Sequence, residues 1–385
     1  MVAPMSRTIF LDGYMLGRPF VGTGINRYLI NLLRELARIT AGEDRLAFRI
    51  LVPSADACEL DGLASRPRFE IAPRRLMRLH RLWKYALVNT LSAGLRAGTL
   101  FEPIPVSVYV KPKRLAVTVH DVIPLLFPEQ YNSPLGKVFL HTYTSSMRRA
   151  DLILTVSECS KSDMVSRFGV PGAKVVVAPE GFDSDTFHPG PVSSARAQEL
   201  LQRYAIHRPF ILHVGRGDPR KNLLRLVRCY QMLSSSRMDL DFQLVLAGPL
   251  GWGYQPLLEL LKEPSLQGRV ILTGAVPDHE LAALYRLAAG FAMPSLYEGF
   301  GLPALEAMAC GTPLISSNRS SLPEVAGEAA LYFDPESIEE MSAAMERVLT
   351  DSTLRDELVQ KGLERAKQFS WEACARATLT ALKGL

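Results

Sequence analysis

The sequence predicts an α/β protein made of two doubly wound, Rossmann-like domains that face one another across a cleft. Three observations predict this fold class. Short runs rich in β-branched residues alternate with amphipathic segments along the chain, as in βαβ units with parallel sheets. The length of 385 residues exceeds what one ordinary hydrophobic core supports. A segment rich in Pro, Gly and Ser at 187–194 separates two series of strands and is the expected linker.

The first series of strands begins close to the N-terminus. Strands are predicted at 8–13, 47–53, 115–121, 152–157 and 174–181, and helical patterns at 25–39 and 136–150. Two regions between them, 54–76 and 96–114, are rich in Pro, Gly and Arg, and we expect loops there. Together these elements predict an N-terminal domain over residues 1–190.

The second series of strands follows the linker. Its predicted members span 210–215, 242–248, 269–274, 290–295 and 312–317. From about residue 336 the pattern is helical to the end of the chain. We therefore expect a second Rossmann-like domain over 191–368 and a terminal helix over 369–385. Because open parallel sheets bind ligands at the carboxyl ends of their strands, the residues that follow each strand are candidates for the site.

Composition excludes several classes of protein. Hydrophobic residues make up 48% and charged residues 22%, as in a globular chain rather than a disordered one. No apolar run reaches the roughly 18 residues of a membrane span. The first residues do not resemble a secretory signal, so we expect a cytoplasmic protein. The five cysteines lack CxxC spacing, which argues against both a disulfide framework and a zinc site.

The excess of basic residues lies in the first half of the chain, above all in residues 66–84. This stretch contains seven Arg and Lys residues and a single acid, Glu70, with Leu and Trp residues at near-helical spacing. Such a pattern is typical of a helix on an anionic bilayer, and equally of a solvated helix whose apolar stripe packs on its own domain. Since no nucleic-acid-binding module accompanies the charge, nucleic acid is not an expected partner.

The most informative segment, 291–317, reads FAMPSLYEGFGLPALEAMACGTPLISS. A buried strand leads into a glycine-containing turn and then into a helix, whose N-terminus presents unpaired N–H groups and a positive partial charge. This arrangement predicts an anion site, most plausibly for phosphate. The two carboxylates, Glu298 and Glu306, would repel a phosphate and therefore suit sugar or ribose hydroxyls. The helix dipole alone would explain Glu306 but not the turn.

A second motif, HVGRGDPRKN at 213–222, places cations at a strand end. Arg216, Arg220 and Lys221 precede the next helix, where two or three positive charges beside N–H groups suit a diphosphate. The motif is not a Walker loop, because it has no GxxxxGK[ST] spacing. Ordinary surface charge is the alternative interpretation of these cations.

The first half contributes two weaker signals. GTGINRY at 22–28 is a glycine-rich turn after a strand and before a long helix, and it lacks the GxGxxG spacing of a dinucleotide-binding oxidoreductase. In LAVTVHDVIPLLFPE at 115–129, His120 and Asp121 stand at the end of a strand. A single histidine in such a place is more often structural than functional, so these residues alone do not decide its role.

Taken together, the motifs resemble the retaining, nucleotide-sugar-dependent glycosyltransferases with the GT-B fold, of the glycosyltransferase family 4 type. The resemblance rests on Glu298 and Glu306 as E-x7-E within EGFGLPALEAMACGTPLI, and on HVGRGDPRKN. LPEVAGEAALYFDP at 322–335 and FSWEACARATL at 369–379 add to it. It covers essentially the whole second half of the chain and implies that the terminal helix crosses back to the first domain.

The resemblance implies roles for residues of both halves. In similar enzymes the first glutamate contacts the sugar, the second contacts the ribose, and a Lys with an Arg stabilises the leaving diphosphate. A histidine after a first-domain strand contacts the donor sugar, and a glycine loop approaches the donor phosphates and the acceptor. Arg216 stands one residue closer to Lys221 than is usual, which makes Lys221 the firmer assignment. The implied catalytic residues are His120, Arg216, Lys221 and Glu298, and the implied donor-binding residues are Gly22, Thr23, Gly24, Arg216, Lys221, Phe300, Gly301, Leu302 and Glu306.

The resemblance also suggests a donor and an acceptor. GTGINRY together with HDVIPLLFPE is similar to bacterial mannosyltransferases of surface-polysaccharide assembly, which implies GDP-mannose and a lipid-linked saccharide at the inner face of the membrane. A UDP-sugar donor remains open, as does a sugar-nucleotide epimerase on the same fold. The family generally needs no metal and no cofactor, because positive side chains and a helix end take that role.

Overall fold

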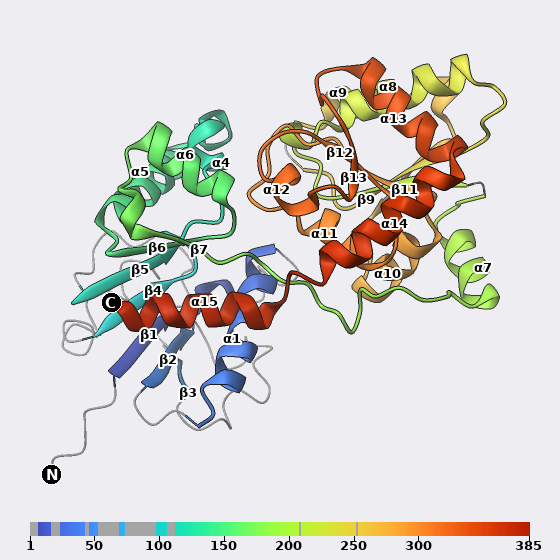
Figure 1. The fold of residues 1–385 in the computed structure, drawn as a ribbon. Coiled ribbons are helices and arrows are strands. Elements are labelled where there is room, and N and C mark those ends of the chain that lie inside the picture. Colours follow the sequence, from blue (N-terminus) through green and yellow to red (C-terminus); the bar gives the residue numbers. More distant parts are fainter. Residues whose placement is uncertain are drawn as a thin grey trace, which may run out of the picture. The chain divides into compact units, whose positions relative to one another are not determined.

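A computed structural model describes most of the chain as two compact units (Figure 1). Unit 1 comprises Met1–Gly181 together with Ser370–Leu385, and unit 2 comprises Phe182–Phe369. The described residues are 7–16, 24–42, 46–52, 69–73, 98–105, 112–207, 209–251 and 253–385. No helix within these ranges is long and apolar enough to cross a membrane.

Among the described residues, unit 1 contains a seven-stranded parallel sheet in the order β3-β2-β1-β4-β5-β6-β7. Its strands are β1 (Arg7–Asp12), β2 (Leu46–Val52), β3 (Phe69–Pro73), β4 (Thr99–Glu102), β5 (Arg114–Thr118), β6 (Leu152–Thr155) and β7 (Val175–Val177). Its helices are η1 (Tyr14–Leu16), α1 (Gly24–Ile39), α4 (Ile123–Leu126), η4 (Pro128–Tyr131), α5 (Pro134–Arg149), α6 (Glu158–Phe168), η5 (Gly172–Lys174) and α15 (Trp371–Gly384).

Unit 2 repeats this architecture with a six-stranded parallel sheet in its described part, ordered β10-β9-β8-β11-β12-β13. The strands are β8 (Phe210–Val214), β9 (Gln243–Ala247), β10 (Val270–Gly274), β11 (Gly290–Met293), β12 (Leu314–Ser317) and β13 (Ala330–Phe333). The helices are α7 (Ser194–Arg203), η6 (Pro219–Lys221), α8 (Leu223–Ser236), α9 (Gln255–Leu260), η7 (Pro264–Leu266), α10 (Asp278–Leu287), α11 (Leu302–Ala309), α12 (Leu322–Ala326), α13 (Ile338–Thr350) and α14 (Ser352–Ala366).

Helices cover both faces of each sheet, as predicted for doubly wound domains. In unit 2, α8, α9 and α13 pack together on one face, while α10, α11 and α14 pack on the other (Figure 1). Strands enclosed in this way bury both faces, which explains why β9 (QLVLA) and β11 (GFAM) are buried along their whole length. The strand order reverses between β1 and β4 and between β8 and β11, and ligands bind at such switch points.

The C-terminal helix returns to the first unit, as predicted. Figure 1 shows α15 beside α1, and the two helices share a hydrophobic core with the sheet. Trp371 at the start of α15 is buried, and its ring lies 6.1 Å from that of Tyr28 on α1. Arg38 on α1 forms an ion pair with Glu372. The last segment of the chain is therefore an integral part of the first unit's core.

The boundary between the units precedes the linker that the sequence predicts. The sequence suggests a first domain over 1–190, whereas the structure divides the chain after Gly181 and again after Phe369. Phe187 is buried, with its ring 6.1 Å from that of Tyr285 on α10, and the carbonyl oxygen of Thr186 accepts a hydrogen bond from Arg286. The first residues of the expected linker are thus packed onto unit 2.

Two regions expected to be loops contain strands, and that expectation was wrong in these places. β3 lies within 54–76 and pairs with β2, and β4 lies within 96–114 between β1 and β5. Both strands are short, and their sequences, FEIAP and TLFE, are too brief for an alternation to be recognised. β13 was likewise not expected as a strand. Apart from β3, the basic segment 66–84 lies outside the described residues.

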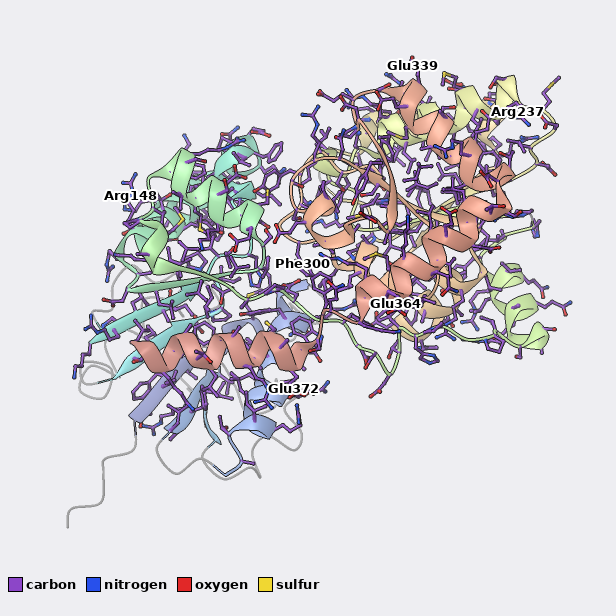
Figure 2. The ribbon with its side chains drawn as sticks, viewed as in Figure 1. Arg148, Arg237, Phe300, Glu339, Glu364 and Glu372 are labelled. Atoms are coloured by element: carbon purple, nitrogen blue, oxygen red, sulfur yellow. The ribbon has the colours of Figure 1, made fainter. Side chains whose placement is uncertain are left out.

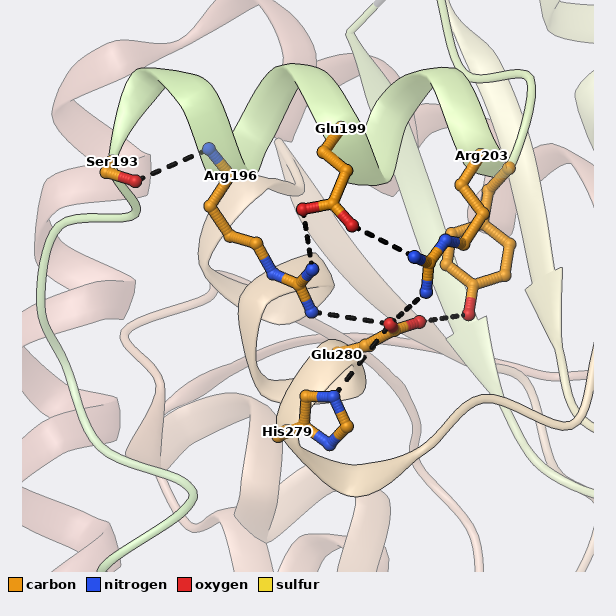
Figure 3. Close-up of polar contacts among 7 residues, drawn as sticks. Ser193, Arg196, Glu199, Arg203, His279 and Glu280 are labelled. Carbon is orange, nitrogen blue, oxygen red and sulfur yellow. Dashed lines mark hydrogen bonds and ion pairs between the residues drawn. The ribbon is translucent and has the colours of Figure 1, made fainter.

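A buried carboxylate fixes α7 to the rest of unit 2 (Figure 3). Glu280 on α10 is only 3% exposed and accepts hydrogen bonds from the hydroxyl of Tyr204 at 2.5 Å and from Arg196 at 3.3 Å. Arg203 adds a further ion pair, and Glu199 pairs with both arginines. The Tyr204 hydrogen bond and the arginines lower the pKa of Glu280, against the opposing effect of burial.

Candidate active site

The candidate site in unit 2 is built on the segments that follow β8 and β11. After β8 the chain passes through residues 215–218 into η6, and α8 then begins at Leu223. After β11 the segment 294–301 leads into α11. The backbone N–H of Leu296 donates to the carbonyl oxygen of Arg220 at 2.8 Å, which joins the two segments. The two motifs singled out in the sequence therefore lie side by side at the switch point of the sheet.

Asn222 fixes this junction and was missed by the sequence analysis. It precedes α8 in the left-handed conformation, with φ of 60°. Its side-chain amide donates to the carbonyl oxygens of Pro294 at 3.1 Å and Pro335 at 2.7 Å, while its Oδ1 accepts from Arg225 at 3.0 Å. The signal in the sequence was an Asn directly before a helix, because Asn tolerates the left-handed region better than most residues.

Glu298 and Lys221 meet in a buried ion pair, which the sequence analysis did not predict. Lys221 Nζ lies 2.6 Å from Glu298 Oε1, and Arg220 Nη1 lies 2.8 Å from Glu298 Oε2. Arg220 also donates to the carbonyl oxygen of Tyr297 at 3.0 Å. The side chains of Lys221 and Glu298 are each 8% exposed, and that of Arg220 is 16% exposed. We call Arg220, Lys221 and Glu298 the strand-end cluster.

The strand-end cluster keeps its carboxylate ionised beside two cations. Burial raises the pKa of Glu298, but the charges of Arg220 and Lys221 outweigh burial and hold this pKa at about 2. Burial lowers the pKa of Lys221, an effect that Glu298 opposes and Arg220 reinforces. Two cations therefore lie against one carboxylate in a place that is largely shielded from water. Such a place attracts an anion.

His213 on β8 packs directly beneath this cluster without adding to its charge. The imidazole is fully buried, and its Nδ1 donates to the carbonyl oxygen of Ala292 at 2.9 Å. Burial lowers the pKa of His213 to about 4, so the ring is neutral at physiological pH. A Cβ on Gly215 would lie 3.3 Å from His213 Nε2 and 3.6 Å from Lys221 Nζ, so only a small residue fits between them.

The turn before α11 is held by side-chain hydrogen bonds that the sequence analysis did not identify. The N–H of Glu298 donates to Ser320 Oγ at 2.9 Å, and Ser321 Oγ donates to the carbonyl oxygen of Phe300 at 2.8 Å. Gly301 caps α11 with φ of 109°, a conformation that side chains rarely adopt, and a Cβ there would lie 2.9 Å from Leu322 Cδ2. Both the backbone conformation and the space next to Leu322 therefore favour glycine at this position.

The remaining predicted residues of unit 2 lie around this turn. Phe300 is buried with its ring 5.7 Å from that of Phe369, and Leu302 begins α11 (Figure 2). Glu306 lies within α11, is 5% exposed, and accepts from the Tyr285 hydroxyl at 3.4 Å. Arg216 differs from the other cations, because its side chain is 65% exposed and its Nε lies 3.5 Å from Asp218 Oδ1. The structure therefore places Arg220, rather than Arg216, against Glu298.

In unit 1, His120 lies at the carboxyl end of the sheet, as predicted, and has well-defined neighbours. Its Nδ1 lies 3.3 Å from Glu180 Oε1 and its Nε2 lies 3.2 Å from the carbonyl oxygen of Pro103. The ring of Tyr28 contacts it edge-on with centroids 4.5 Å apart. The neighbouring Asp121 accepts a hydrogen bond from the N–H of Ile123 at 2.8 Å.

The predicted glycine loop is described only at its end. Gly24 is the first residue of α1 and is exposed. Gly22 and Thr23 lie outside the described residues.

Comparisons with known proteins agree with the sequence motifs. The sequence pattern of "Glycosyl transferases group 1" matches residues 199–365, and that of "Glycosyltransferase Family 4" matches residues 22–186. An "O-antigen chain mannosyltransferase B" from Escherichia coli is 37% identical over 273 residues, which cover 70% of each chain. The chain therefore belongs to the glycosyltransferases of group 1 and family 4.

Other relatives and solved structures are also similar to this glycosyltransferase in sequence or in fold. The "Serotype-specific mannosyltransferase WbdA" from Escherichia coli is 32% identical over 271 residues, or 70% of this chain and 33% of that one. Sucrose-phosphate synthase from Thermosynechococcus elongatus has a TM-score of 0.72 at 23% identity, with 98% of each chain covered. Anabaena HepE in complex with UDP-glucose also has a TM-score of 0.72, at 18% identity, over 98% of this chain and all of that one. The predicted GT-B fold is confirmed.

Proposed function

We propose that this glycosyltransferase transfers mannose from GDP-mannose to a hydroxyl of a lipid-linked saccharide in polysaccharide biosynthesis, and that it retains the α configuration. The observation that carries the proposal is the strand-end cluster, where buried Lys221 and Arg220 share Glu298 at the switch point of the sheet. Two cations at a strand end, largely shielded from water, suit the diphosphate of a sugar nucleotide. The mannosyltransferase names of the relatives from Escherichia coli support mannose as the sugar.

In the proposed reaction, the bond between the anomeric carbon and the donor phosphate breaks as a bond to the acceptor oxygen forms on the same face. The leaving phosphate takes the acceptor proton. Lys221, with Arg216 at the exposed rim, stabilises the negative charge that develops on the diphosphate. Glu298 accepts from sugar hydroxyls and orients Lys221, and Glu306 accepts from the ribose. The backbone of Phe300, Gly301 and Leu302 contacts sugar or phosphate.

Two further features belong to the proposal. We propose that the enzyme needs neither a metal nor a cofactor, because side-chain cations neutralise the diphosphate. We also propose that His120 contacts the donor sugar, and that the loop at Gly22, Thr23 and Gly24 approaches the phosphates. The basic stretch 66–84 would hold the enzyme at an anionic membrane surface, where a lipid-linked acceptor is located.

A UDP-sugar is the alternative donor, since HepE is described in complex with UDP-glucose. Thermal unfolding with GDP, UDP, ADP or dTDP, each with and without EDTA, distinguishes the two. A ligand at about 100 times its dissociation constant adds roughly 2.7 kcal/mol, a readily measured shift. A shift with GDP that survives EDTA supports the proposal, whereas a shift with UDP alone keeps the enzyme class and overturns the donor.

Two lysine variants test whether the strand-end cluster is the binding site. Lys221→Ala should abolish most of the nucleotide-induced shift. Lys262→Ala is the matched control, because Lys262 lies in the same unit with a side chain that is 71% exposed and pairs with Glu259 at 2.7 Å. An equal shift in both variants would place the nucleotide elsewhere. Release of GDP from GDP-mannose only when an acceptor is present separates a transferase from an epimerase.

A further inference from the structure

Glu180, a residue outside the motifs found in the sequence, contacts His120 at the carboxyl edge of the sheet in unit 1. Glu180 follows β7 and His120 follows β5, and these strands flank β6 in the sheet. The carboxyl ends of parallel strands meet at one edge, which brings the two side chains together. His120 Nδ1 lies 3.3 Å from Glu180 Oε1, and the side chains are 14% and 8% exposed.

The neighbours of the imidazole determine where its protons are. His120 Nε2 lies 3.2 Å from the carbonyl oxygen of Pro103, which can only accept, so Nε2 carries a hydrogen. A neutral ring protonated at Nε2 would turn the lone pair of Nδ1 toward the carboxylate of Glu180. The contact is attractive only if a proton lies between Nδ1 and Oε1. The pair of side chains therefore holds one shared proton in addition to the one on Nε2.

The ring is also fixed in orientation. Tyr28, which is 1% exposed, contacts it edge-on at 4.5 Å, and the Tyr28 hydroxyl is hydrogen-bonded to Thr118 Oγ1 at 3.1 Å. The backbone oxygen of His120 accepts from Ser160 Oγ at 3.2 Å. With Nδ1 held by Glu180, the Nε2–H is the part of the ring that can exchange the Pro103 carbonyl for a substrate oxygen.

We propose that Glu180 is a positioning residue that makes His120 a hydrogen-bond donor to an oxygen of the sugar nucleotide. With Nδ1–H donating to Glu180 and Nε2–H to the Pro103 carbonyl, the ring carries a hydrogen on both nitrogens, and the carboxylate stabilises this doubly protonated form, in which Nε2 cannot be a bare acceptor. His120 then donates from Nε2 to a hydroxyl or phosphate oxygen and does not act as a general base. This inference rests on the proposed contact between His120 and the donor.

A double-mutant cycle tests the proposal. Release of nucleoside diphosphate from GDP-mannose, or from UDP-glucose if GDP-mannose is inert, is measured for wild type, Glu180→Leu, His120→Ala and the double variant. We expect Glu180→Leu to lower kcat about 10- to 100-fold, the range for a lost hydrogen bond to a charged group, with a smaller change in KM. In the His120→Ala background the same substitution should have almost no further effect, since the residues act as a unit.

The variants separate positioning from a structural role. Glu180→Asp, which keeps the carboxylate, should restore part of the lost kcat. Glu280→Gln is the matched control, because it alters a buried, ion-paired carboxylate in the other unit and should combine additively with His120→Ala. If His120→Ala is fully active, the proposed contact with the donor fails. If His120→Ala is impaired but Glu180→Leu is not, or if the two effects add, the role of Glu180 is overturned.

A spectroscopic measurement tests the proposal without any substrate. Proton NMR of the wild type should show a strongly downfield imidazole N–H resonance that is absent from His120→Ala, arising from the proton between Nδ1 and Glu180. Glu180→Leu should lose this resonance even where the variant is folded and inactive. Its persistence in Glu180→Leu, or its absence from the wild type, would contradict the proposed proton.

Discussion

Unit 2 contains two buried glutamates that each attract two cations, and they differ in where the cations come from. Glu280 is paired with Arg196 and Arg203, whose side chains are 33% and 50% exposed and belong to α7. Glu298 is paired with Arg220 and Lys221, whose side chains are 16% and 8% exposed and follow β8. The first pair of cations remains hydrated, while the second is largely removed from water.

The surroundings of the two clusters differ as well. Glu199 pairs with both arginines of the Glu280 cluster, so two carboxylates balance two cations (Figure 3). In the strand-end cluster two cations lie against one carboxylate, and Asp218, which contacts Arg216, lies close by. A hydrated cluster fixes one helix to another, whereas two buried cations at a strand end are suited to bind an anion.

The largest difference is expected when each carboxylate is neutralised. Glu298→Gln leaves Arg220 and Lys221 buried without their counter-charge, and breaking a buried pair in this way costs about 3 to 5 kcal/mol. Glu280→Gln should cost about 1 kcal/mol, because its arginines are partly in water and keep Glu199. Urea unfolding of the two variants measures both values. Equal losses would mean that burial of the cations does not separate the two clusters.

Removing one cation from each cluster should lower activity in one case and only stability in the other. Lys221→Ala is expected to lower kcat about 100- to 1,000-fold, the usual effect of losing one group that stabilises transition-state charge. Arg203→Ala should leave kcat unchanged and lower the unfolding temperature slightly. Steady-state rates of GDP release from GDP-mannose, with thermal unfolding of the same samples, provide the measurement. A comparable loss of kcat in Arg203→Ala would contradict the distinction.

Acid should destabilise the protein partly through Glu298. Its pKa is about 2 in the folded protein and 4.5 ordinarily, so the unfolded chain takes up a proton at a higher pH than the folded one. The stabilisation is complete above pH 4.5 and is lost as the pH falls toward 2. At about 1.4 kcal/mol per pKa unit it amounts to roughly 3 kcal/mol.

The difference in unfolding free energy between wild type and Glu298→Gln, measured by urea unfolding from pH 7 to pH 3, should shrink as the pH falls. The pKa of Glu280 is also lowered, so the corresponding difference for Glu280→Gln should shrink in the same direction but by less. A difference that stays constant with pH for Glu298→Gln would show that Arg220 and Lys221 do not hold its carboxylate ionised.

The sequence predicted the strand-end cluster better than it predicted the Glu280 cluster. Lys221 and Glu298 stand in motifs at strand ends, where position alone indicates proximity. Glu280 stands in none of the motifs, and nothing local shows that α7, more than 70 residues away, supplies its partners. Short central strands such as β4 escaped prediction for the same reason, since their burial depends on neighbours distant in sequence.

The same limit applies within the candidate site. Asn222, Ser320 and Glu180 act through contacts with residues many positions away, so their sequence context did not distinguish them from loop residues. Arg220 shows the opposite case, because the motif predicted a cation there but not which of the three cations meets Glu298. Packing selects Arg220, since it contacts the segment that follows β11 while Arg216 remains exposed.

The smallest expected effect comes from a single hydroxyl in the Glu280 cluster. The hydroxyl of Tyr204 donates to Glu280 at 2.5 Å. Burial and, to a smaller extent, the Glu280 carboxylate raise the pKa of Tyr204 to about 12. Tyr204→Phe keeps the ring and removes the donor, which should cost about 1 kcal/mol by urea unfolding. Because Arg196 and Arg203 still neutralise Glu280, kcat and nucleotide binding should not change. A loss of activity in Tyr204→Phe would mean that α7 is coupled to the strand-end cluster, and the two glutamates would then belong to one functional network rather than two independent ones.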